Sequence, residues 1–429
     1  MPFSPCVYYN INMMIQNDAK TLSSAIAVLP SGADVPRRPR LGILGGTFHP
    51  IHLGHLDMAL SALKMLGLDK VLLMVDRIPP HKELAEGASD SQRLEMVKLA
   101  AAPHPGLEAS DFELLREGTS YTALTLTLLQ ERFPEEDLFF IMGSDMLRTL
   151  HTWYHPEIIC AKAKLVCICR QGEEGGEQEA AERLQKAFGA EVILLPPVRE
   201  VSSTLIRERT AQGLPIGHLV PPSVEEYICA HGLYAPAPIP TLTAAMEQSL
   251  KPGRFAHTVG VMLTAMEMAE HLGINGEKAR LGALLHDCAK SLPIEEQYSL
   301  AKRAQGQLMP TDIAPIVHAP AGSVLAKEVY GIEDEEVLQA ICLHTTGERY
   351  MTPLDKLLFL ADMVEPGRSF EGVETLRQKA LCASSQKELD SALLLAIRHN
   401  ICYIKEKGER LHPASLRALE TLEKEIHSN

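Results

Sequence analysis

The sequence predicts an α/β doubly wound domain followed by an all-α domain. Over residues 40–234, apolar runs of strand length alternate with helical patterns, as in a parallel sheet covered by helices. The first apolar run, from Leu41, meets a Gly45-Gly46 break and then an amphipathic segment at 56–66, the order of strand, tight turn and helix. Residues 235–240 form a proline-rich linker, beyond which the strand-like alternation stops. We therefore expect the second domain to span residues 241–429.

Length and composition are those of a soluble two-domain protein. A chain of 429 residues exceeds what a single core usually holds, and 46% of its residues are apolar. The net charge of −14 argues against nucleic acid or a membrane surface as a partner, because both attract clustered basic residues, and no apolar run is long enough to span a bilayer. Nine cysteines without a CxxC pair indicate reduced thiols and a cytoplasmic protein. Residues 1–39 lack a signal-peptide pattern and are expected to be a disordered extension.

A glycine turn followed by two histidines is a candidate phosphate site. Gly45 and Gly46 allow a phosphate chain to approach main-chain N–H groups at a helix N-terminus, and Thr47 adds a hydroxyl. His52 and His55 are three residues apart and share one face of the first helical turn. The stretch lacks the Gly-Lys-Ser/Thr of a P-loop and the third glycine of a dinucleotide fingerprint. A glycine pair alone also suits an ordinary turn, but with the histidines the pattern favours nucleotidyl transfer, in which positioning and charge neutralisation dominate catalysis.

Polar residues also stand at the ends of the next expected elements. A strand at 71–75 leads into Pro79-Pro-His-Lys82, whose His-Lys pair is either a solvated tip or a cation site. A helix at 91–101 is expected to carry Arg93 on its polar side. Ser120-Tyr121-Thr122 is expected to cap the following helix with its hydroxyls.

The later strands of this half also lead into candidate binding residues. Buried strands are expected at 138–142, 164–169 and 192–195. Gly143-Ser144-Asp145 follows the first of these strands, at the edge where doubly wound sheets bind ligands. After the last strand, Ser202-Ser203-Thr204 opens a helix with Arg207 one turn on, and this set of hydroxyls, N–H groups and a cation suits an anion.

These motifs resemble, in their order over roughly residues 40–234, the HxGH nucleotidyltransferases, and GGTFHPIHLGH resembles the nicotinate-mononucleotide adenylyltransferase family. The resemblance implies a Rossmann-like nucleotidyltransferase domain. It also implies the reaction of ATP, carried with Mg²⁺, with nicotinate mononucleotide to give deamido-NAD and pyrophosphate. The mononucleotide's phosphate would attack in line, so no protein nucleophile is required. Phosphopantetheine and nicotinamide-mononucleotide adenylyltransferases are the alternatives, and the PPHK, SYT and tryptophan positions favour nicotinate.

The same resemblance assigns residues. His52 and His55 would stabilise charge on the ATP phosphates, and Lys82 and Arg207 would hold the leaving pyrophosphate. Alone, Trp153 would suit a core anchor and Ser120 a bare helix cap. The residues implied to bind ATP or the mononucleotide are Gly45, Gly46, Thr47, Phe48, Ser120, Tyr121, Thr122, Gly143, Ser144, Asp145, Trp153, Arg170, Ser202, Ser203 and Thr204.

The second half carries imidazoles and carboxylates, a set that suits divalent iron, manganese or zinc. An adjacent His-Asp pair lets one residue bind one metal while the carboxylate bridges to a second. A single histidine on a helix is usually structural, but six metal-compatible positions in this order resemble an HD-domain phosphohydrolase. They are His257, His286, Asp287, His318, His344 and Asp362.

The segments around these residues, such as 284–290 and 359–368, resemble the YqeK branch of HD proteins. The resemblance implies that the six residues hold two metal ions, iron in that branch, with Asp287 also catalytic, and that diadenosine tetraphosphate is hydrolysed symmetrically to two ADP. Lys290 and Arg368 would neutralise the tetraphosphate, or else belong to a solvated helix face. The alternatives are cleavage of another nucleotide phosphoester and a regulatory module that binds metal and nucleotide. The sequence leaves open a homo-oligomer and any coupling between the two sites.

Overall fold

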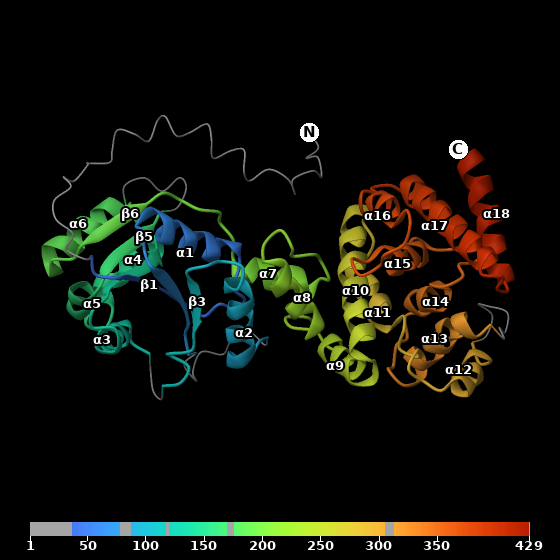
Figure 1. The fold of residues 1–429 in the computed structure, drawn as a ribbon, viewed down its shortest axis with the longest axis horizontal. Coiled ribbons are helices and arrows are strands. Elements are labelled where there is room, and N and C mark those ends of the chain that lie inside the picture. Colours follow the sequence, from blue (N-terminus) through green and yellow to red (C-terminus); the bar gives the residue numbers. More distant parts are fainter. Residues whose placement is uncertain (1–36, 78–86, 117–119, 170–175, 305–312, 429) are drawn as a thin grey trace. The chain divides into compact units, whose positions relative to one another are not determined.

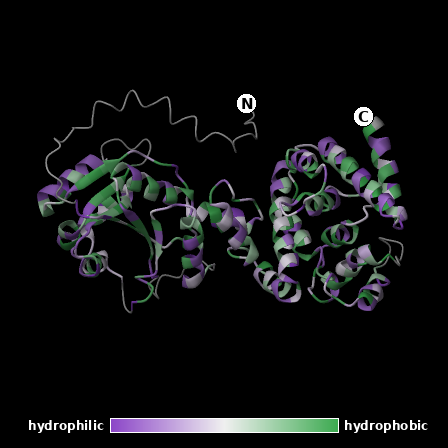
Figure 2. Cartoon of the chain, viewed as in Figure 1, coloured by the Kyte–Doolittle hydropathy of each residue, from purple (hydrophilic) through white to green (hydrophobic). Residues whose placement is uncertain are grey.

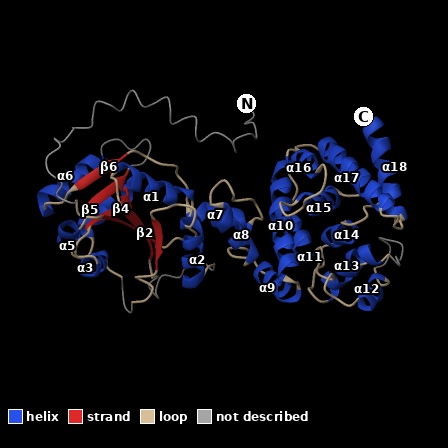
Figure 3. Cartoon of the chain, in the orientation of Figure 1, coloured by secondary structure: helices blue, strands red, loops and turns tan. Residues whose placement is uncertain are grey.

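The computed structural model describes residues 37–77, 87–116, 120–169, 176–304 and 313–428 (Figure 1). Among these residues strands occur only up to Leu195, and from α9 (Ile239–Ser249) onward every regular element is a helix (Figure 3). The predicted order of an α/β region and an all-α region is therefore confirmed. Helix α9 begins at Ile239, so the last two residues of the predicted linker are helical instead. Most of the expected extension, residues 1–36, lies outside the described residues.

The sheet of the first half is parallel and has the strand order β3-β2-β1-β4-β5-β6. The order reverses between β1 and β4, as in Rossmann-like folds. The strand β3 was not expected, because its four residues include the exposed Glu108 and form no apolar run. The strands are β1 (Arg40–Gly46), β2 (Lys70–Val75), β3 (Leu107–Ser110), β4 (Asp137–Gly143), β5 (Lys164–Ile168) and β6 (Val192–Leu195).

Helices cover both faces of this sheet, whose strands are predominantly hydrophobic (Figure 2). Alternate residues of β1 face the two sides: Leu44 packs with one hydrophobic cluster, Leu41 and Ile43 with the other. The first cluster includes residues of α1 (Leu53–Met65), α2 (Asp90–Ala101), α7 (Ser203–Ala211) and α8 (Pro222–Ala230). The second includes residues of α3 (Thr122–Arg132), α4 (Ser144–Thr149), η1 (Leu150–Thr152), α5 (Pro156–Lys162) and α6 (Gly176–Phe188).

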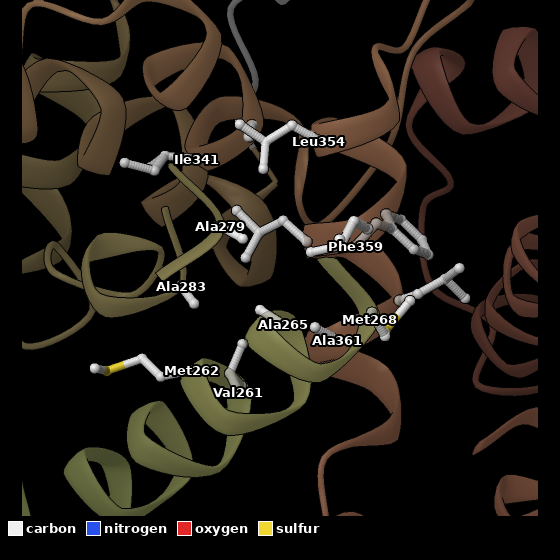
Figure 4. Packing of buried hydrophobic residues seen from close by; sticks show 14 of the residues in the cluster. Val261, Met262, Ala265, Met268, Ala279, Ala283, Ile341, Leu354, Phe359 and Ala361 are labelled. Atoms are coloured by element: carbon white, nitrogen blue, oxygen red, sulfur yellow. The ribbon is translucent and has the colours of Figure 1, made fainter. Parts of the chain in front are cut away.

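The helical half builds its core around α10, α11, α14 and α15. Figure 4 shows Met262 and Ala265 of α10 near Ala283 of α11, with Phe359 of α15 alongside. None of the described helices is both long and apolar enough to cross a membrane. The helices after α9 are α10 (Pro252–Leu272), α11 (Gly276–Leu285), α12 (Ile294–Ala301), η2 (Ala314–Ile316), α13 (His318–Glu328), α14 (Glu335–Leu343), α15 (Pro353–Val364), α16 (Val373–Leu381), α17 (Gln386–Glu406) and α18 (Pro413–Ser428).

The packing of β1 predicts the effect of Gly42→Ala. A Cβ at this position would lie 2.8 Å from Val71 Cγ2 and 2.9 Å from Leu68 Cδ1, closer than side-chain carbons approach. We expect the substitution to lower the free energy of unfolding of the sheet domain by about 1–3 kcal/mol, as overpacking does. Denaturant titration followed by circular dichroism measures this change. Gly143→Ala is the control, because a Cβ there meets nothing within 4 Å; equal losses in the two variants would contradict the packing argument.

Candidate active sites

The two glycine motifs of the first half lie on neighbouring strands. Strand β1 ends at Gly46 and β4 at Gly143, and these strands are paired. Ligands of open parallel sheets bind at this reversal point, outside the carboxyl ends of the strands. Ser144 is fully buried and Asp145 is exposed. The structure therefore brings the residues after Gly45 and those after Gly143 to one edge of the sheet.

His52 and His55 stack on one another at the start of α1. Their ring centroids are 3.6 Å apart with an interplanar angle of 17°. The His52 Nδ1 accepts a hydrogen bond from the His55 N–H at 3.3 Å, so the proton of a neutral ring lies on Nε2. Burial lowers the pKa of His52 to about 4, and burial together with His52 lowers the pKa of His55 well below its usual value. The pair is therefore neutral at pH 7, which permits the stacking and leaves the His52 Nε2–H as a hydrogen-bond donor.

The turn that carries these histidines is held from inside by Phe48. Its φ of 44° lies in the left-handed region, a conformation that costs a residue with a side chain about 1–3 kcal/mol. The Phe48 ring is buried and contacts His55 edge-on, with centroids 5.0 Å apart. This packing stabilises the strained turn. A ligand contact at Phe48 would therefore come from its backbone.

Helix α7 meets this loop although about 150 residues separate them in sequence. The Ser203 hydroxyl donates to the Pro50 carbonyl at 2.9 Å, and Arg207 Nη1 donates to the His49 carbonyl at 2.7 Å. Ser202 caps α7 by accepting from the Leu205 N–H at 3.0 Å. These side chains thus tie α7 to the loop, and their role in holding an anion stays a prediction.

The predicted position of Arg93 is wrong. It does not lie on a polar helix face but is completely buried. Its guanidinium donates to the Thr47 carbonyl, to the Asp76 carbonyl at 2.9 Å and to Asp90 Oδ1 at 2.8 Å. Because a buried cation requires such partners, Arg93 fixes the glycine turn relative to the end of β2.

His49 was not singled out from the sequence, although it lies inside the glycine–histidine motif. The ring is buried and its Nε2 accepts from the Ala88 N–H at 3.2 Å. Burial, with Arg207 and Arg93, lowers the pKa of His49 to about 4. His49 therefore connects the loop to Ala88, in the segment that precedes α2.

The other predicted contacts of this half have mixed outcomes. Helix α3 has Tyr121 as its N-cap without a side-chain hydrogen bond, so the expected hydroxyl cap is wrong. Tyr121 instead packs against Tyr154, with ring centroids 4.4 Å apart, and both are exposed. Trp153 is half-buried and packs edge-on against Phe140, which suits an anchor and leaves part of its ring accessible. Lys82 and Arg170 lie outside the described residues.

The six predicted metal ligands of the helical half converge. His257 Nε2 lies 3.0 Å from Asp362 Oδ1, His286 Nε2 3.6 Å from Asp287 Oδ2, and His318 Nε2 3.2 Å from Asp287 Oδ1. His344 Nε2 is 3.2 Å from His318 Nε2. Two groups have ligand atoms within 4.8 Å of one another, and they share His286: His257, His286 and Asp362; His286, Asp287 and His344.

Two of these histidines are C-cap residues, and the end of the helix sets the orientation of the ring. His286 is the C-cap of α11 and His344 the C-cap of α14. The last carbonyls of a helix lack amide partners, and each ring uses one: His286 Nδ1 donates to the Ala283 carbonyl at 2.6 Å and His344 Nδ1 to the Ile341 carbonyl at 2.7 Å. With the proton on Nδ1, each Nε2 has a lone pair that is available to a metal ion, as metal binding requires.

Charges around the cluster of six residues favour ionised carboxylates and neutral rings at His318 and His344, whereas hydrogen bonds to Asp362 and Glu365 outweigh burial and raise the pKa of His257. Burial alone would raise the pKa of Asp287, but His286, His318 and His344 hold it well below its usual range. Burial lowers the pKa of His344 to about 3 and also lowers that of His318. Cations border the site as well: Arg254 Nη1 lies 2.9 Å from Asp287 Oδ2, Lys290 Nζ 2.9 Å from His318 Nδ1, and Arg368 pairs with Asp362.

This set of donors fits divalent metal ions. The buried Nε2 of His286 has no hydrogen-bond partner among the described residues, although it lies 3.6 Å from Asp287 Oδ2 and 3.9 Å from Asp362 Oδ1. Orphaned ring nitrogens beside ionised carboxylates are what a metal centre requires. His257, His286, His344 and the two aspartates would hold the ions, with His318 beside Asp287.

Two family models match this chain, one in each half. Residues 43–209 match the cytidylyltransferase-like family and residues 254–367 the HD domain. A probable nicotinate-nucleotide adenylyltransferase from Synechococcus sp. (strain JA-3-3Ab) is 43% identical over 199 residues, which cover 46% of this chain and 96% of the relative. The nicotinate-nucleotide adenylyltransferase of Bacillus subtilis (strain 168) is 38% identical over 195 residues, covering 46% and 98%. The chain belongs to the nicotinate-nucleotide adenylyltransferase family.

One solved structure is similar to part of this chain. A crystal structure of a predicted HD superfamily hydrolase involved in NAD metabolism from Clostridium acetobutylicum is 37% identical and covers 43% of this chain and 96% of its own, with a TM-score of 0.40.

One acidic pair in the adenylyltransferase half was not predicted. Asp76 follows β2, and its Oδ1 lies 3.4 Å from where a Cβ on Gly45 would be. Its side chain hydrogen-bonds to the buried Glu113, which also accepts from Thr125 Oγ1 at 2.6 Å. Burial and the Glu113 carboxylate raise the pKa of Asp76 to about 7, against the effect of Arg93. A proton shared between the two carboxyl groups therefore stabilises the pair below neutral pH.

This pair predicts that Asp76→Asn raises the melting temperature in a pH-dependent way. The pKa of Asp76 is raised to about 7 in the folded state from an ordinary value of 3.8, so this residue contributes stability below pH 3.8 that is lost as pH rises to about 7. An amide needs no proton to donate to Glu113. The variant should therefore melt a few degrees higher than the wild type at pH 8, and the difference should shrink toward pH 5.

Differential scanning calorimetry at the two pH values measures this gain. The control is Asp111→Asn, an exposed aspartate near Glu113, which should leave the melting temperature unchanged. A variant Asp76→Asn that is less stable than the wild type at pH 8 would contradict the shared proton.

Proposed function

We propose that the chain is a bifunctional enzyme. Its first half transfers the adenylyl group of ATP to nicotinate mononucleotide, giving deamido-NAD and pyrophosphate. Its HD domain hydrolyses diadenosine tetraphosphate symmetrically to two ADP, with two divalent metal ions, iron in the proposed state. ATP and diadenosine tetraphosphate both carry an adenine nucleotide and a phosphate chain.

The first activity is supported by the family membership together with the stacked histidines at the strand-order reversal. The relatives that match residues of this half are named for nicotinate nucleotide adenylylation. The His52 Nε2–H and the main-chain N–H groups of the glycine turn would bind the phosphate chain, because His52 is the N-cap of α1 and has its Nδ1 already occupied. A bound phosphate would raise the pKa of the histidine rings, so that they gain positive charge when the ligand arrives.

In this reaction the chain positions reactants and stabilises charge. The mononucleotide's phosphate oxygen attacks the α-phosphorus of ATP, and the bond from that phosphorus to the β-bridging oxygen breaks, so pyrophosphate leaves. Mg²⁺ enters with ATP as part of the substrate. His52 and His55 stabilise the charge that develops on the phosphates. Arg93 and Arg207 stabilise the turn by donating hydrogen bonds to its main-chain carbonyls. No protein nucleophile takes part.

The second activity is supported by the convergence of four imidazoles and two carboxylates, with three cations in contact with them. Bound divalent ions would lower the pKa of a coordinated water and polarise phosphate oxygens. The residues of the chain do the rest. His257, His286 and His344 would offer Nε2 lone pairs, and His286 belongs to both ligand groups. Arg254, Lys290 and Arg368 are placed at the carboxylates and His318, where they would neutralise a polyphosphate.

Two variants of the full-length protein separate the activities. His55→Ala should lower deamido-NAD formation at least about 100-fold, as loss of a transition-state donor does, and should leave diadenosine tetraphosphate hydrolysis unchanged. His286→Ala with Asp287→Ala should abolish hydrolysis and leave adenylyl transfer unchanged. Chromatography of the products, with ferrous iron supplied to the hydrolase assay under anaerobic conditions, measures both reactions. The controls are His151→Ala and His271→Ala, two exposed histidines of the respective halves.

The products decide between the proposed function and its alternatives. A preference for nicotinamide mononucleotide over nicotinate mononucleotide would contradict the first assignment. ATP plus AMP from diadenosine tetraphosphate would contradict symmetrical cleavage. An absence of hydrolysis with nucleoside monophosphates as well as dinucleoside polyphosphates would favour a regulatory module over an enzyme.

A further inference from the structure

His257 is oriented in a different way from His286 and His344. His286 and His344 end their helices and use free backbone carbonyls, whereas His257 is the sixth residue of the long helix α10. Inside a helix the carbonyls are already occupied by amide groups of the next turn. The His257 Nδ1 therefore has no local backbone acceptor and must find one elsewhere.

Glu365 supplies that acceptor. Its Oε1 lies 3.0 Å from His257 Nδ1, while Asp362 Oδ1 lies 3.0 Å from His257 Nε2 on the opposite side of the ring. Glu365 is the C-cap of α15, three residues after Asp362, so one turn of chain contacts both ring nitrogens. Glu365 was not among the site residues predicted from the sequence.

The surroundings of Glu365 hold its carboxylate at this place. It is 4% exposed, and its Oε2 accepts from the Gly367 N–H at 2.6 Å. A Cβ at Gly260, one turn along α10 from His257, would lie 2.7 Å from the same Oε2. The carboxylate thus occupies space that a glycine leaves on the histidine's own helix. Arg377 fixes the main chain here, donating to the Glu365 carbonyl at 3.1 Å.

We propose that Glu365 is a positioning residue for the metal centre. By accepting the Nδ1 proton of His257, it would keep the Nε2 lone pair available for an ion bound beside Asp362, and its negative charge would make the ring a stronger ligand. His257 belongs to one of the two ligand groups only. Glu365 therefore controls the affinity of one metal ion and not of the other. This inference rests on the proposed metal centre.

The test is a titration of metal-free full-length protein with Co²⁺, followed by calorimetry and by the visible absorption of the bound ion. Glu365→Gln keeps the shape and one acceptor oxygen but removes the charge. We expect one of two binding steps to weaken about 10- to 100-fold and the other to change less than about threefold. His257→Ala should remove the same step, which identifies it.

Two further variants separate positioning from a merely structural role. Gly260→Ala changes no charge but should push the carboxylate away and weaken the same step. Glu371→Gln, an exposed glutamate of the same connection, is the control and should bind both ions as the wild type does. The melting temperature of the metal-free protein should be similar in Glu365→Gln and the wild type.

Each result has a defined meaning. Unchanged affinities in Glu365→Gln, or an equal loss in both steps accompanied by a lower melting temperature of the metal-free protein, would overturn the inference. A wild-type protein that binds no Co²⁺ would instead contradict the proposed metal centre itself. The two failures are therefore distinguishable.

Discussion

Both candidate sites depend on histidine rings whose tautomer is set by the end of a helix. A helix N-terminus has free N–H groups, so His52, the N-cap of α1, accepts on Nδ1 and is left with a donor at Nε2. A helix C-terminus has free carbonyls, so His286 and His344 donate from Nδ1 and are left with a lone pair at Nε2. The first arrangement suits a phosphate oxygen and the second a metal ion. Helix polarity thus gives the same side chain two different chemical roles in one chain.

Burial strengthens this assignment in both halves. It lowers the pKa of His52 to about 4 and that of His344 to about 3, so that neither ring is protonated in the free protein at pH 7. Neutral rings can stack, as His52 and His55 do, and can pack beside one another around Asp287 without repulsion. In the helical half, positive charge beside the rings comes instead from guanidinium and ammonium groups such as Arg254 and Lys290.

The sequence predicted the elements whose pattern is local. Strand β6 and the glycine turn after β1 followed from apolar runs and turn residues, and the candidate metal ligands followed from the resemblance of their order to HD proteins. It did not predict interactions that depend on which segments meet. Arg93 has the spacing of an exposed helix residue, yet it is buried because the glycine turn and the end of β2 present carbonyls to it. Glu365 resembles any surface glutamate until α15 is packed against His257. Strand β3 is recognisable only from its pairing with β2.

The tautomers can be observed directly. Two-bond ¹H–¹⁵N correlation spectra of metal-free protein labelled at its histidines, with resonances assigned by single His→Ala variants, distinguish a proton on Nδ1 from one on Nε2. We expect the Nε2–H form for His52 and the Nδ1–H form for His286 and His344 at pH 7. The same tautomer in all three residues, or doubly protonated rings at this pH, would contradict the assignment of donor and ligand roles by helix polarity.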